Sequence, residues 1–416
     1  MSEWKETTLD HLFDVQNGYS FKSSEMSDEY EENCLEVFKM GHIKKGGGLR
    51  KNPKRNYVPF SESLKKFILN KGDLVMAMTD MKDNVVILGI PAKIDKSNHY
   101  VLNQRVARLV KKDDDQNDAD FLFYQMIWRD FVLDLQSRAN SGVQVNLSTS
   151  AIKASVFVIP PPSEQQNIAS ILSSLDDKIH LLHRQNQTLE QMAEILFRQW
   201  FVEEADEDWE VVQLQDIAEI KNGFAFSSRS YVDFSPEHLE VLKMGHIEKG
   251  GGLRTDPKRD YVPREERLER YILDKGDIVM AMTDMKDNVV ILGVPAMIDE
   301  SDRYVLNQRV ARIYLKNRDS LINEYLLYVQ LKDPDFIAVL QSKANSGVQV
   351  NLSTASIKES EILIPPMELQ LEKGNSITDL YLKKEYNDKQ IKSLTKLRDT
   401  LLPKLMSREI RLIENG

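Results

Sequence analysis

The sequence has a single cysteine and no long apolar run. Cys34 cannot form an internal disulfide and has no second cysteine with which to hold a metal, which indicates a reducing compartment. No apolar stretch is long enough to span a bilayer, and the opening MSEWKETTLD lacks the basic and apolar regions of a signal peptide. We therefore expect a cytoplasmic protein with no membrane segment.

Signatures of catalysis are also missing. GHIKKGGG at 41–48 does not match the phosphate loop GxxxxGK[ST], and no GxGxxG motif follows a predicted strand. The prolines at 160–162 and 365–366 lack the flanking Asn or Asp and aromatic residue that an amino-methyltransferase needs. His180 and His183 lie three residues apart, but no carboxylate or cysteine set completes a zinc site. The sequence therefore predicts no catalytic centre, no metal and no cofactor.

The net charge of -10, from 55 Lys and Arg against 65 Asp and Glu, argues against indiscriminate binding to nucleic acid. Acidic residues cluster at 28–33, 113–120 and 203–210. Basic residues gather elsewhere, because residues 39–66 contain nine lysines and arginines against one acid, Glu62. A local positive face is therefore expected on an acidic protein.

The chain is a tandem duplication. KMGHIKKGGGLR at 39–50 recurs as KMGHIEKGGGLR at 243–254, and MAMTDMKDNVVILG at 76–89 recurs letter for letter at 280–293. VLNQRVAR and ANSGVQVNLST also occur twice. This period is far too long for a solenoid and predicts a duplicated domain with an internal pseudo-twofold relation. Such a molecule suits a target that itself has two halves.

Each copy combines a mixed region with a helical tail. Short strand-like runs such as FILNKGDLVMAM and VFVIP, punctuated by Gly, Asn and Pro, predict a β-rich α+β domain. Residues 121–136 and 324–341 have helical spacing, and Pro334 interrupts the second of these segments.

A long helix is predicted after each group of prolines. The first begins at a capping-box pattern of Ser163 with Gln166 and reaches Val202. Its apolar residues recur every seventh position, at Ile168, Leu175, Leu182, Leu189 and Leu196. A less regular second helix is marked by Ile377, Leu380, Ile391, Leu394, Leu401 and Leu405. We expect the two helices to pair as an antiparallel coiled coil that holds the mixed domains apart, like a ruler.

Four segments in each copy carry residue types that contact nucleic acid. The basic segment at 39–58 offers Lys and Arg for phosphates, glycines for close backbone approach and a tyrosine for stacking. TDMKDN at 79–84 and NQR at 103–105 carry side chains that read base edges, with Asn and Gln suited to adenine and Arg to guanine. The polar loop at 140–148 adds a glutamine. Each segment has a structural alternative: a solvated loop, a plain turn or a polar loop that supports the fold.

These segments supply our candidate DNA-contacting residues. In the first copy they are Lys39, His42, Lys44, Lys45, Arg50, Lys54, Arg55, Tyr57, Thr79, Asp80, Lys82, Asn84, Asn103, Gln104, Arg105 and Gln144. In the second copy they are Lys243, His246, Lys249, Arg254, Lys258, Arg259, Tyr261, Thr283, Asp284, Lys286, Asn288, Asn307, Gln308, Arg309 and Gln349.

The order of the motifs resembles the specificity subunits of type I restriction-modification systems. In each half, NGYSF or NGFAF is followed by KGDLVMAMTD or KGDIVMAMTD, then by NQRVAR, SGVQVNLS and IPPPSEQQNIASIL or IPPMELQ. The first helix ends in ILFRQWF and the chain in LLPKLMSREIRL, both similar to the family's helical ends. In one departure, Glu372, Lys373 and Gly374 stand where the first copy has the apolar IAS pattern, so a looser start of the second helix is expected.

The resemblance implies two target-recognition domains, residues 1–162 and 205–366, that each read one half of a bipartite site on double-stranded DNA. A central spacer helix, 163–204, and a C-terminal spacer helix, 367–416, would space the domains and bind two modification subunits. Those subunits would methylate adenine with S-adenosylmethionine, and separate restriction (motor) subunits would cleave unmodified DNA. The chain itself would be non-catalytic and would bind no cofactor.

The near identity of the copies adds a sharper expectation. Because segments 39–58, 76–89 and 101–108 almost match their counterparts, both domains should prefer nearly the same bases. With the pseudo-twofold relation, this predicts an inverted repeat around a nonspecific spacer. Two alternatives stay open: a free-standing methyltransferase or nuclease, which would need catalytic motifs not found here, and a duplicated scaffold that binds only proteins.

Overall fold

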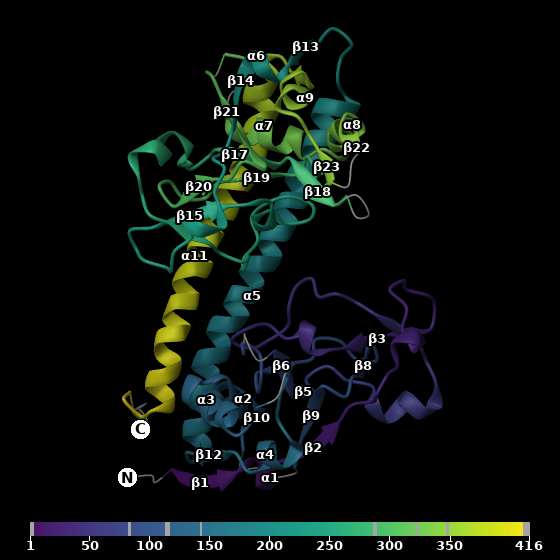
Figure 1. Ribbon diagram of the computed structural model, residues 1–416, viewed down its shortest axis with the longest axis vertical. Helices are drawn as coiled ribbons and strands as arrows, with labels where there is room; N and C mark the ends of the chain where they lie inside the picture. The colour runs from purple at the N-terminus through teal and green to yellow at the C-terminus, as the bar shows by residue number, and fades with distance from the viewer. Residues whose placement is uncertain are drawn as a thin grey trace. The chain divides into compact units, whose positions relative to one another are not determined.

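The computed structural model separates into two compact units, each with one mixed domain and parts of both long helices (Figure 1). One unit is formed by Met1–His180 with Lys392–Gly416, and the other by Leu181–Ile391. The structure describes residues 4–81, 85–112, 117–141, 144–285, 289–317, 319–321, 323–346 and 349–410. Within these ranges no helix is both long and apolar enough to cross a membrane.

Two sheets form the centre of the first domain. An antiparallel four-stranded sheet has the order β2-β9-β5-β7. Its strands are β2 (Phe13–Asn17), β5 (Leu74–Ala77), β7 (Pro91–Lys93) and β9 (Val106–Lys111). A second sheet, β4-β3-β8, pairs β3 antiparallel with β4 and parallel with β8. Its strands are β3 (Cys34–Phe38), β4 (Tyr57–Pro59) and β8 (Tyr100–Leu102).

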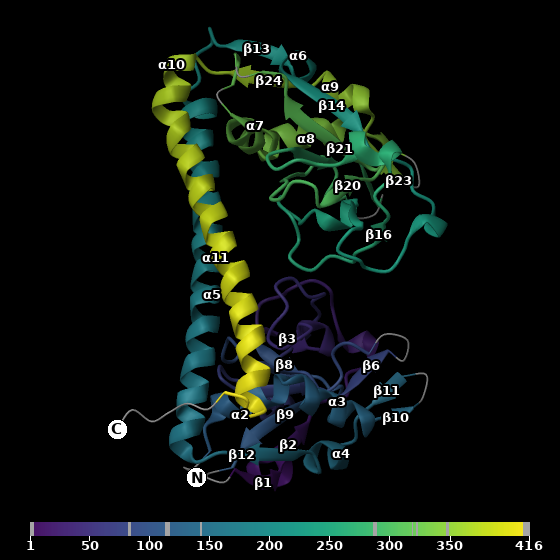
Figure 2. The ribbon, with the colours of Figure 1, turned by 90° about the vertical axis from the view of Figure 1, so that its left-hand side faces the viewer.

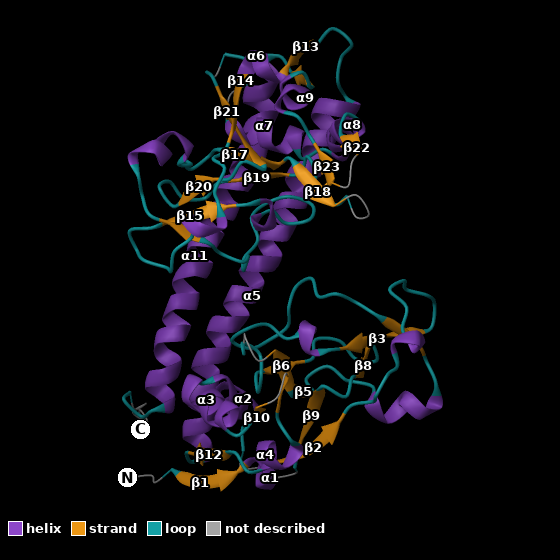
Figure 3. Ribbon diagram, viewed as in Figure 1, coloured by secondary structure: helices purple, strands orange, loops and turns teal. Residues whose placement is uncertain are grey.

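Smaller elements complete this domain (Figure 3). The sheets β1-β12 and β10-β11-β6 are formed by β1 (Lys5–Thr8), β6 (Thr79–Met81), β10 (Asn140–Ser141), β11 (Gln144–Asn146) and β12 (Val156–Ile159). The short α-helices are α1 (Leu9–Leu12), α2 (Ala119–Ile127), α3 (Arg129–Ser137) and α4 (Thr149–Lys153).

The second domain repeats this plan. Its four-stranded sheet, β14-β21-β17-β19, contains β14 (Ala218–Asn222), β17 (Ile278–Ala281), β19 (Pro295–Met297) and β21 (Val310–Leu315). The smaller sheets contain β13 (Glu210–Gln213), β15 (Leu239–Leu242), β16 (Tyr261–Val262), β18 (Thr283–Met285), β20 (Tyr304–Leu306), β22 (Asn345–Ser346), β23 (Gln349–Asn351) and β24 (Glu361–Ile364). The short helices are α6 (Leu214–Ile217), α7 (Glu324–Leu331), α8 (Pro334–Ser342) and α9 (Thr354–Lys358). The predicted α+β duplication is therefore confirmed.

The predicted helical segment 121–136 is divided between α2 and α3, because Trp128 adopts an extended conformation between them. In the second domain, Asp333 caps α8 by accepting a hydrogen bond from the backbone N–H of Asp335. Pro334 thus occupies the first turn, where its missing N–H leaves no helical bond unmade. The proline begins a helix here.

A long helix follows each group of prolines. The first, α5 (Pro162–Arg198), continues as a π-helical turn at Gln199–Glu203. It begins at a proline one residue before Ser163, so this serine lies inside the first turn and the expectation that it caps the helix is wrong. The second helix begins as α10 (Met367–Leu369), passes through a π-helical turn at Gln370–Gly374 and continues as α11 (Asn375–Met406). The π turn falls where the looser start was expected.

The helices pair antiparallel, as predicted. In the first unit, Arg398 of α11 binds Asp176 of α5 at 2.7 Å. In the second unit, Asn186 donates to Asp388 at 2.7 Å and accepts from Asn387 at 2.9 Å. Rising numbers on α5 thus meet falling numbers on α11 (Figure 2).

Each hydrophobic core draws on both copies of the repeat. In the first unit, Leu405 and Met406 of α11 belong to the same buried cluster as Phe121 and Phe157. In the second unit, Phe197 of α5 belongs to the cluster formed around α7. Burying such side chains contributes on the order of 2 kcal/mol each. The ends of the long helices are therefore part of the domains.

Candidate nucleic-acid interface

The basic loop of each domain directly follows strand β3 or β15. Three consecutive glycines shape it. Gly46, Gly47 and Gly48 have φ angles of 80°, 102° and 83°, which favour glycine. A Cβ atom on Gly47 would lie 2.7 Å from Cγ2 of Ile127. The Lys44 N–H donates to the carbonyl of Gly48 at 2.9 Å and closes the loop. The glycines therefore fix a tight turn whose lysines face solvent.

A buried carboxylate supports this loop from below. His42, only 2% exposed, lies with Nε2 2.9 Å from Glu36. The Lys39 N–H donates to Nδ1 of His42 at 3.1 Å, which leaves Nε2 to donate to the carboxylate. Burial lowers the pKa of His42 against the opposing effect of Glu36. His99 also reaches Glu36, at 3.1 Å.

The second domain keeps this support with one change. His246 lies 3.1 Å from the buried Glu240, and Arg303 replaces the second histidine at 3.1 Å. Burial raises the pKa of Glu240, but hydrogen bonds from His246 and Arg303 outweigh it and leave that pKa below its usual value. The structure thus places both His42 and His246 inside the fold, where they shape the loops.

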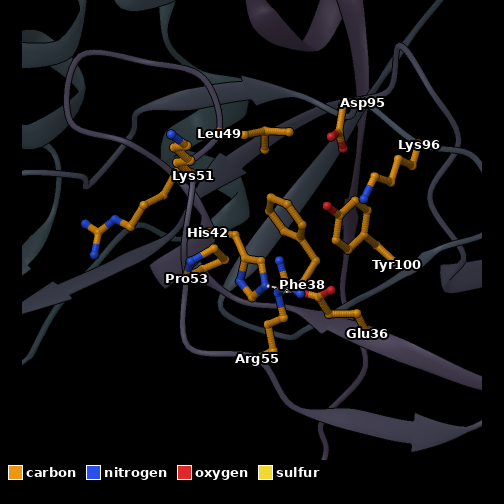
Figure 4. A pocket seen from close by; sticks show the side chains of 11 residues that line it. Glu36, Phe38, His42, Leu49, Lys51, Pro53, Arg55, Asp95, Lys96 and Tyr100 are labelled. Atoms are coloured by element: carbon orange, nitrogen blue, oxygen red, sulfur yellow. Dashed lines mark hydrogen bonds and ion pairs between the residues drawn. The ribbon is translucent and has the colours of Figure 1, made fainter. Parts of the chain in front are cut away.

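A cavity of about 200 Å³ opens beside this carboxylate (Figure 4). In the figure His42 and Arg55 extend toward Glu36. The lining residues are Glu36, Phe38, His42, Leu49, Arg50, Lys51, Pro53, Arg55, Asp95, Lys96 and Tyr100. With four of them Lys or Arg, the mouth is suited to an anionic group.

The NQR turn lies beside the basic loop. Because β3 and β8 are parallel with Phe38 opposite Leu102, Lys39 and Asn103 leave the same edge of their sheet. The Asn103 side chain is 8% exposed and accepts from the backbone N–H of Arg105 at 3.2 Å. Asn103 and its counterpart Asn307 therefore hold the turn.

The next two residues of the turn face solvent. Gln104 and Arg105 are exposed, as are Gln308 and Arg309 in the second domain. The carbonyl of Arg105 accepts from the backbone N–H of Met78 at 3.0 Å, just before β6. The NQR turn thus lies between the basic loop and the β6 segment.

The first half of TDMKDN is structural. Thr79 is 5% exposed and donates to Asn146 at 2.9 Å, and Thr283 donates to Asn351 at 3.0 Å. Asp80 is 4% exposed, and its carboxylate accepts hydrogen bonds from the backbone N–H groups of Met81, Val86, Ile87 and Leu88. The equivalent Asp284 accepts from the N–H groups of Met285, Val290 and Ile291. The candidates Lys82, Asn84, Lys286 and Asn288 lie outside the described residues.

Methionines at the ends of β6 and β18 were missed by the sequence reasoning. Met81 is 57% exposed and Met285 is 60% exposed. The half-exposed Gln144 lies opposite Met81 in the β6-β11 pair, and Gln349 has the same register opposite Met285. An apolar residue in the middle of an otherwise polar motif was the available signal.

The two candidate tyrosines are less accessible to DNA than the glutamine and arginine of the NQR turn. Tyr57 is half-buried with its ring 5.4 Å from that of Tyr30, and Tyr261 lies 5.2 Å from Phe234. Both contacts are edge-on, which leaves part of each ring open. Several cations are exposed around them, namely Lys44, Lys45, Arg50, Lys54, Arg55, Lys249, Lys258 and Arg259, whereas Lys39, Lys243 and Arg254 are half-buried.

Comparison with known proteins gives one consistent family. The model of the type I restriction modification DNA specificity domain matches residues 1–191 and again residues 206–396. The MjaIX specificity subunit of Methanocaldococcus jannaschii is 25% identical, over 76% of this chain and 74% of that protein. The HindI specificity subunit of Haemophilus influenzae is 24% identical, over 70% of this chain and 77% of that protein.

The fold has the same relatives. The crystal structure of a type I restriction-modification S subunit from M. genitalium superposes with a TM-score of 0.53 at 20% identity, covering 97% of this chain and 96% of that one. The two family matches account for most of the chain, and each covers one mixed domain with most of the long helix that follows it. The chain therefore belongs to the type I restriction-modification DNA specificity family.

Proposed function

We propose that this chain is the non-catalytic subunit that selects the DNA target, with each domain reading one half of a bipartite site. The observation that carries the proposal is the exposed NQR turn, which stands between a basic loop and a polar strand end in both domains. Phosphate contacts position a protein on DNA, while base edges are read by amide and guanidinium groups. Both kinds of group occur side by side here.

Within this site we assign roles by exposure. Gln104, Arg105 and Gln144 contact base edges, and Met81 contacts a thymine methyl group. The buried His42, Thr79, Asp80 and Asn103 keep these groups in place. Gln308, Arg309 and Met285 have the same roles in the second domain.

The target is an inverted repeat around a nonspecific spacer. The support is the identity of the exposed reading residues: Gln308, Arg309 and Met285 repeat Gln104, Arg105 and Met81. Two domains with the same exposed groups prefer the same bases. With the pseudo-twofold relation expected of the tandem repeat, the two domains would read opposite strands.

Partner subunits supply the chemistry. Two modification subunits bind the paired helices and methylate adenine, and restriction subunits join through the complex. Apolar side chains on the helices support this binding, since Ile195 is 65% exposed, Met192 44% and Leu382 47%. Such side chains on otherwise polar helices favour a protein partner.

The test is to express the chain with its modification subunits in a strain without other methyltransferases and to map methylated adenines by single-molecule sequencing. A bipartite motif with mirror-related halves is expected. Two unrelated half-sites would refute the inverted repeat, and no motif at all would favour a scaffold that binds only proteins.

Paired variants sharpen the test. Gln104→Ala and Gln308→Ala should relax the same base position, each in one half of the motif, because a base contact is worth about 1–3 kcal/mol. Leu133→Ala, at a position of α3 that is 50% exposed, controls for general effects of substitution away from the paired helices. If both glutamine variants keep the full motif, these residues do not read bases.

A further inference from the structure

The two basic loops, 39–58 and 243–262, share a backbone but differ in charge. Their loop-closing hydrogen bonds are the same: Lys44 N–H to Gly48 and Glu248 N–H to Gly252, both at 2.9 Å. The first loop has seven lysines and arginines and no acid, a net charge of +7. The second loop has five lysines and arginines and three acids, a net charge of +2.

The first difference lies at the start of the loop. Lys44 is replaced by Glu248, whose carboxylate lies 4.0 Å from Nε of Arg254. Arg254 is accordingly half-buried, whereas the equivalent Arg50 is exposed and forms no ion pair with another described residue. One domain presents two free cations where the other holds an internal pair.

The second difference lies at the other end of the loop. Lys39 donates to the neutral amide of Asn56 at 2.6 Å, while Lys243 donates to the carboxylate of Asp260 at 2.6 Å. Burial and the nearby Lys54 lower the pKa of Lys39. Burial also lowers the pKa of Lys243, but hydrogen bonds to Asp260 and Tyr231 raise it above its usual value. The second domain therefore neutralises the charge of Lys243 with a carboxylate, whereas the first bonds Lys39 to a neutral amide.

A third difference lies at the mouth of the cavity. Lys96 lines it together with Arg50 and Lys51. The residue equivalent to Lys96 in the second domain is Glu300, which pairs with Arg303 at 3.3 Å. Acid near the first loop is provided by Asp28, 3.6 Å from Lys54, and both side chains are largely exposed. Solvent screens such a pair strongly.

We propose that the two domains divide the work of binding: the first holds the DNA backbone through its basic loop, and the second adds mainly base contacts. The inference rests on the proposed function and deepens it. Cations bound to phosphates release counterions whatever the base sequence, so the first domain dominates nonspecific binding and its salt dependence. The second domain engages firmly only where its half-site matches.

The test measures the full chain on duplex DNA that lacks the target, by fluorescence anisotropy over a range of salt. Lys44→Glu with Lys51→Thr gives the first loop the residues of the second at two of the four positions where their charges differ, the other two being Asn52 and Asn56. Losing two phosphate contacts lowers the salt slope by about 2, so the loss of affinity between about 50 and 200 mM salt becomes roughly tenfold smaller. A control, Lys178→Glu with Lys396→Thr, makes the same charge change at exposed helix positions and should leave the slope within about 0.5 of the original.

The reciprocal variant, Glu248→Lys with Thr255→Lys, should steepen the slope by about 2. Combining both pairs moves the charge from one domain to the other at constant net charge, and the original slope should return. Equal slopes for the Lys44→Glu, Lys51→Thr variant and its control would overturn the inference. Binding of the unmodified chain to target and non-target DNA separates the two proposals. If the chain prefers its target, equal slopes overturn only the division of work between the domains. If it has no preference, the proposed function itself is refuted.

Discussion

Asp80 binds the backbone N–H groups of Met81 and of residues 86–88, and replacing it by asparagine tests this role. One carboxylate oxygen accepts from the N–H of Met81 at 2.8 Å. The other accepts from the N–H groups of Val86 and Ile87 at 2.7 Å and of Leu88 at 3.2 Å. Asparagine has a similar shape but only one acceptor oxygen and no charge.

The expected loss follows from these contacts. If the asparagine oxygen faces the three N–H groups of residues 86–88, its own N–H₂ faces the Met81 N–H and leaves that donor unpaired. An unpaired buried donor costs about 1–3 kcal/mol, and a hydrogen bond to a charged acceptor is worth more than one to a neutral acceptor. Asp80→Asn should therefore lower the free energy of unfolding of the first unit by about 2–4 kcal/mol.

Differential scanning calorimetry of the full chain measures this loss. For a unit of this size, about 3 kcal/mol corresponds to a fall in Tm of roughly 6–12 °C. Asp284→Asn should act similarly on the second unit, because its carboxylate binds the same kind of N–H groups. Asp134→Asn breaks an exposed pair with Arg138 and should cost less than about 0.5 kcal/mol. A Tm for Asp80→Asn equal to that of the Asp134 control would refute the reasoning.

Three further variants test other features. Because the pKa of His42 is lowered in the folded chain, the unfolded chain binds the proton more readily, and stability falls as the pH drops below the ordinary value of 6.5. His42→Gln should therefore make the urea midpoint depend less on pH between about pH 7.5 and 5.5. An unchanged pH dependence would contradict this. Arg398→Ala removes a 2.7 Å ion pair with Asp176 and should cost about 1–3 kcal/mol in urea unfolding, whereas an unchanged midpoint would show that the pair adds nothing. Gly18→Ala places a Cβ 2.3 Å from the backbone of Asn103 and should cost at least about 1–3 kcal/mol; a Tm equal to that of the unmodified chain would disprove this close contact.

The duplicated architecture could be predicted because the repeat and the long apolar periodicities are visible in the letters. The break in the predicted helix 121–136 could not, because Trp128 carries no helix-breaking signal; its backbone is extended and its side chain packs against the core. Asn186 was also missed. It occupies a buried position of the helix pair, but polar residues are read as outward-facing in a heptad pattern.

Candidate site residues were predicted by residue type. Type does not distinguish a residue that contacts bases from one that holds the fold in place. His42 and Asp80 have the chemistry of DNA contacts, yet both are buried and bonded within the domain. Gln104 and Arg105 follow a buried Asn103 in the same motif and are exposed. Only the path of the backbone separates these cases. Met81 was passed over for the opposite reason, since its apolar side chain is not of a type that reads base edges by hydrogen bonding.

The exchange of helix ends between the two cores has a consequence for the history of the chain. Leu405 and Met406, from the second copy, complete the core of the first unit, and Phe197, from the first copy, completes that of the second. A half-length chain would leave this surface bare until a second molecule supplied the missing helix. The protein is thus built like a domain-swapped homodimer whose two subunits were later fused into one polypeptide. Fusion makes pairing independent of concentration and lets the two halves diverge, as the unequal charges of their basic loops already show.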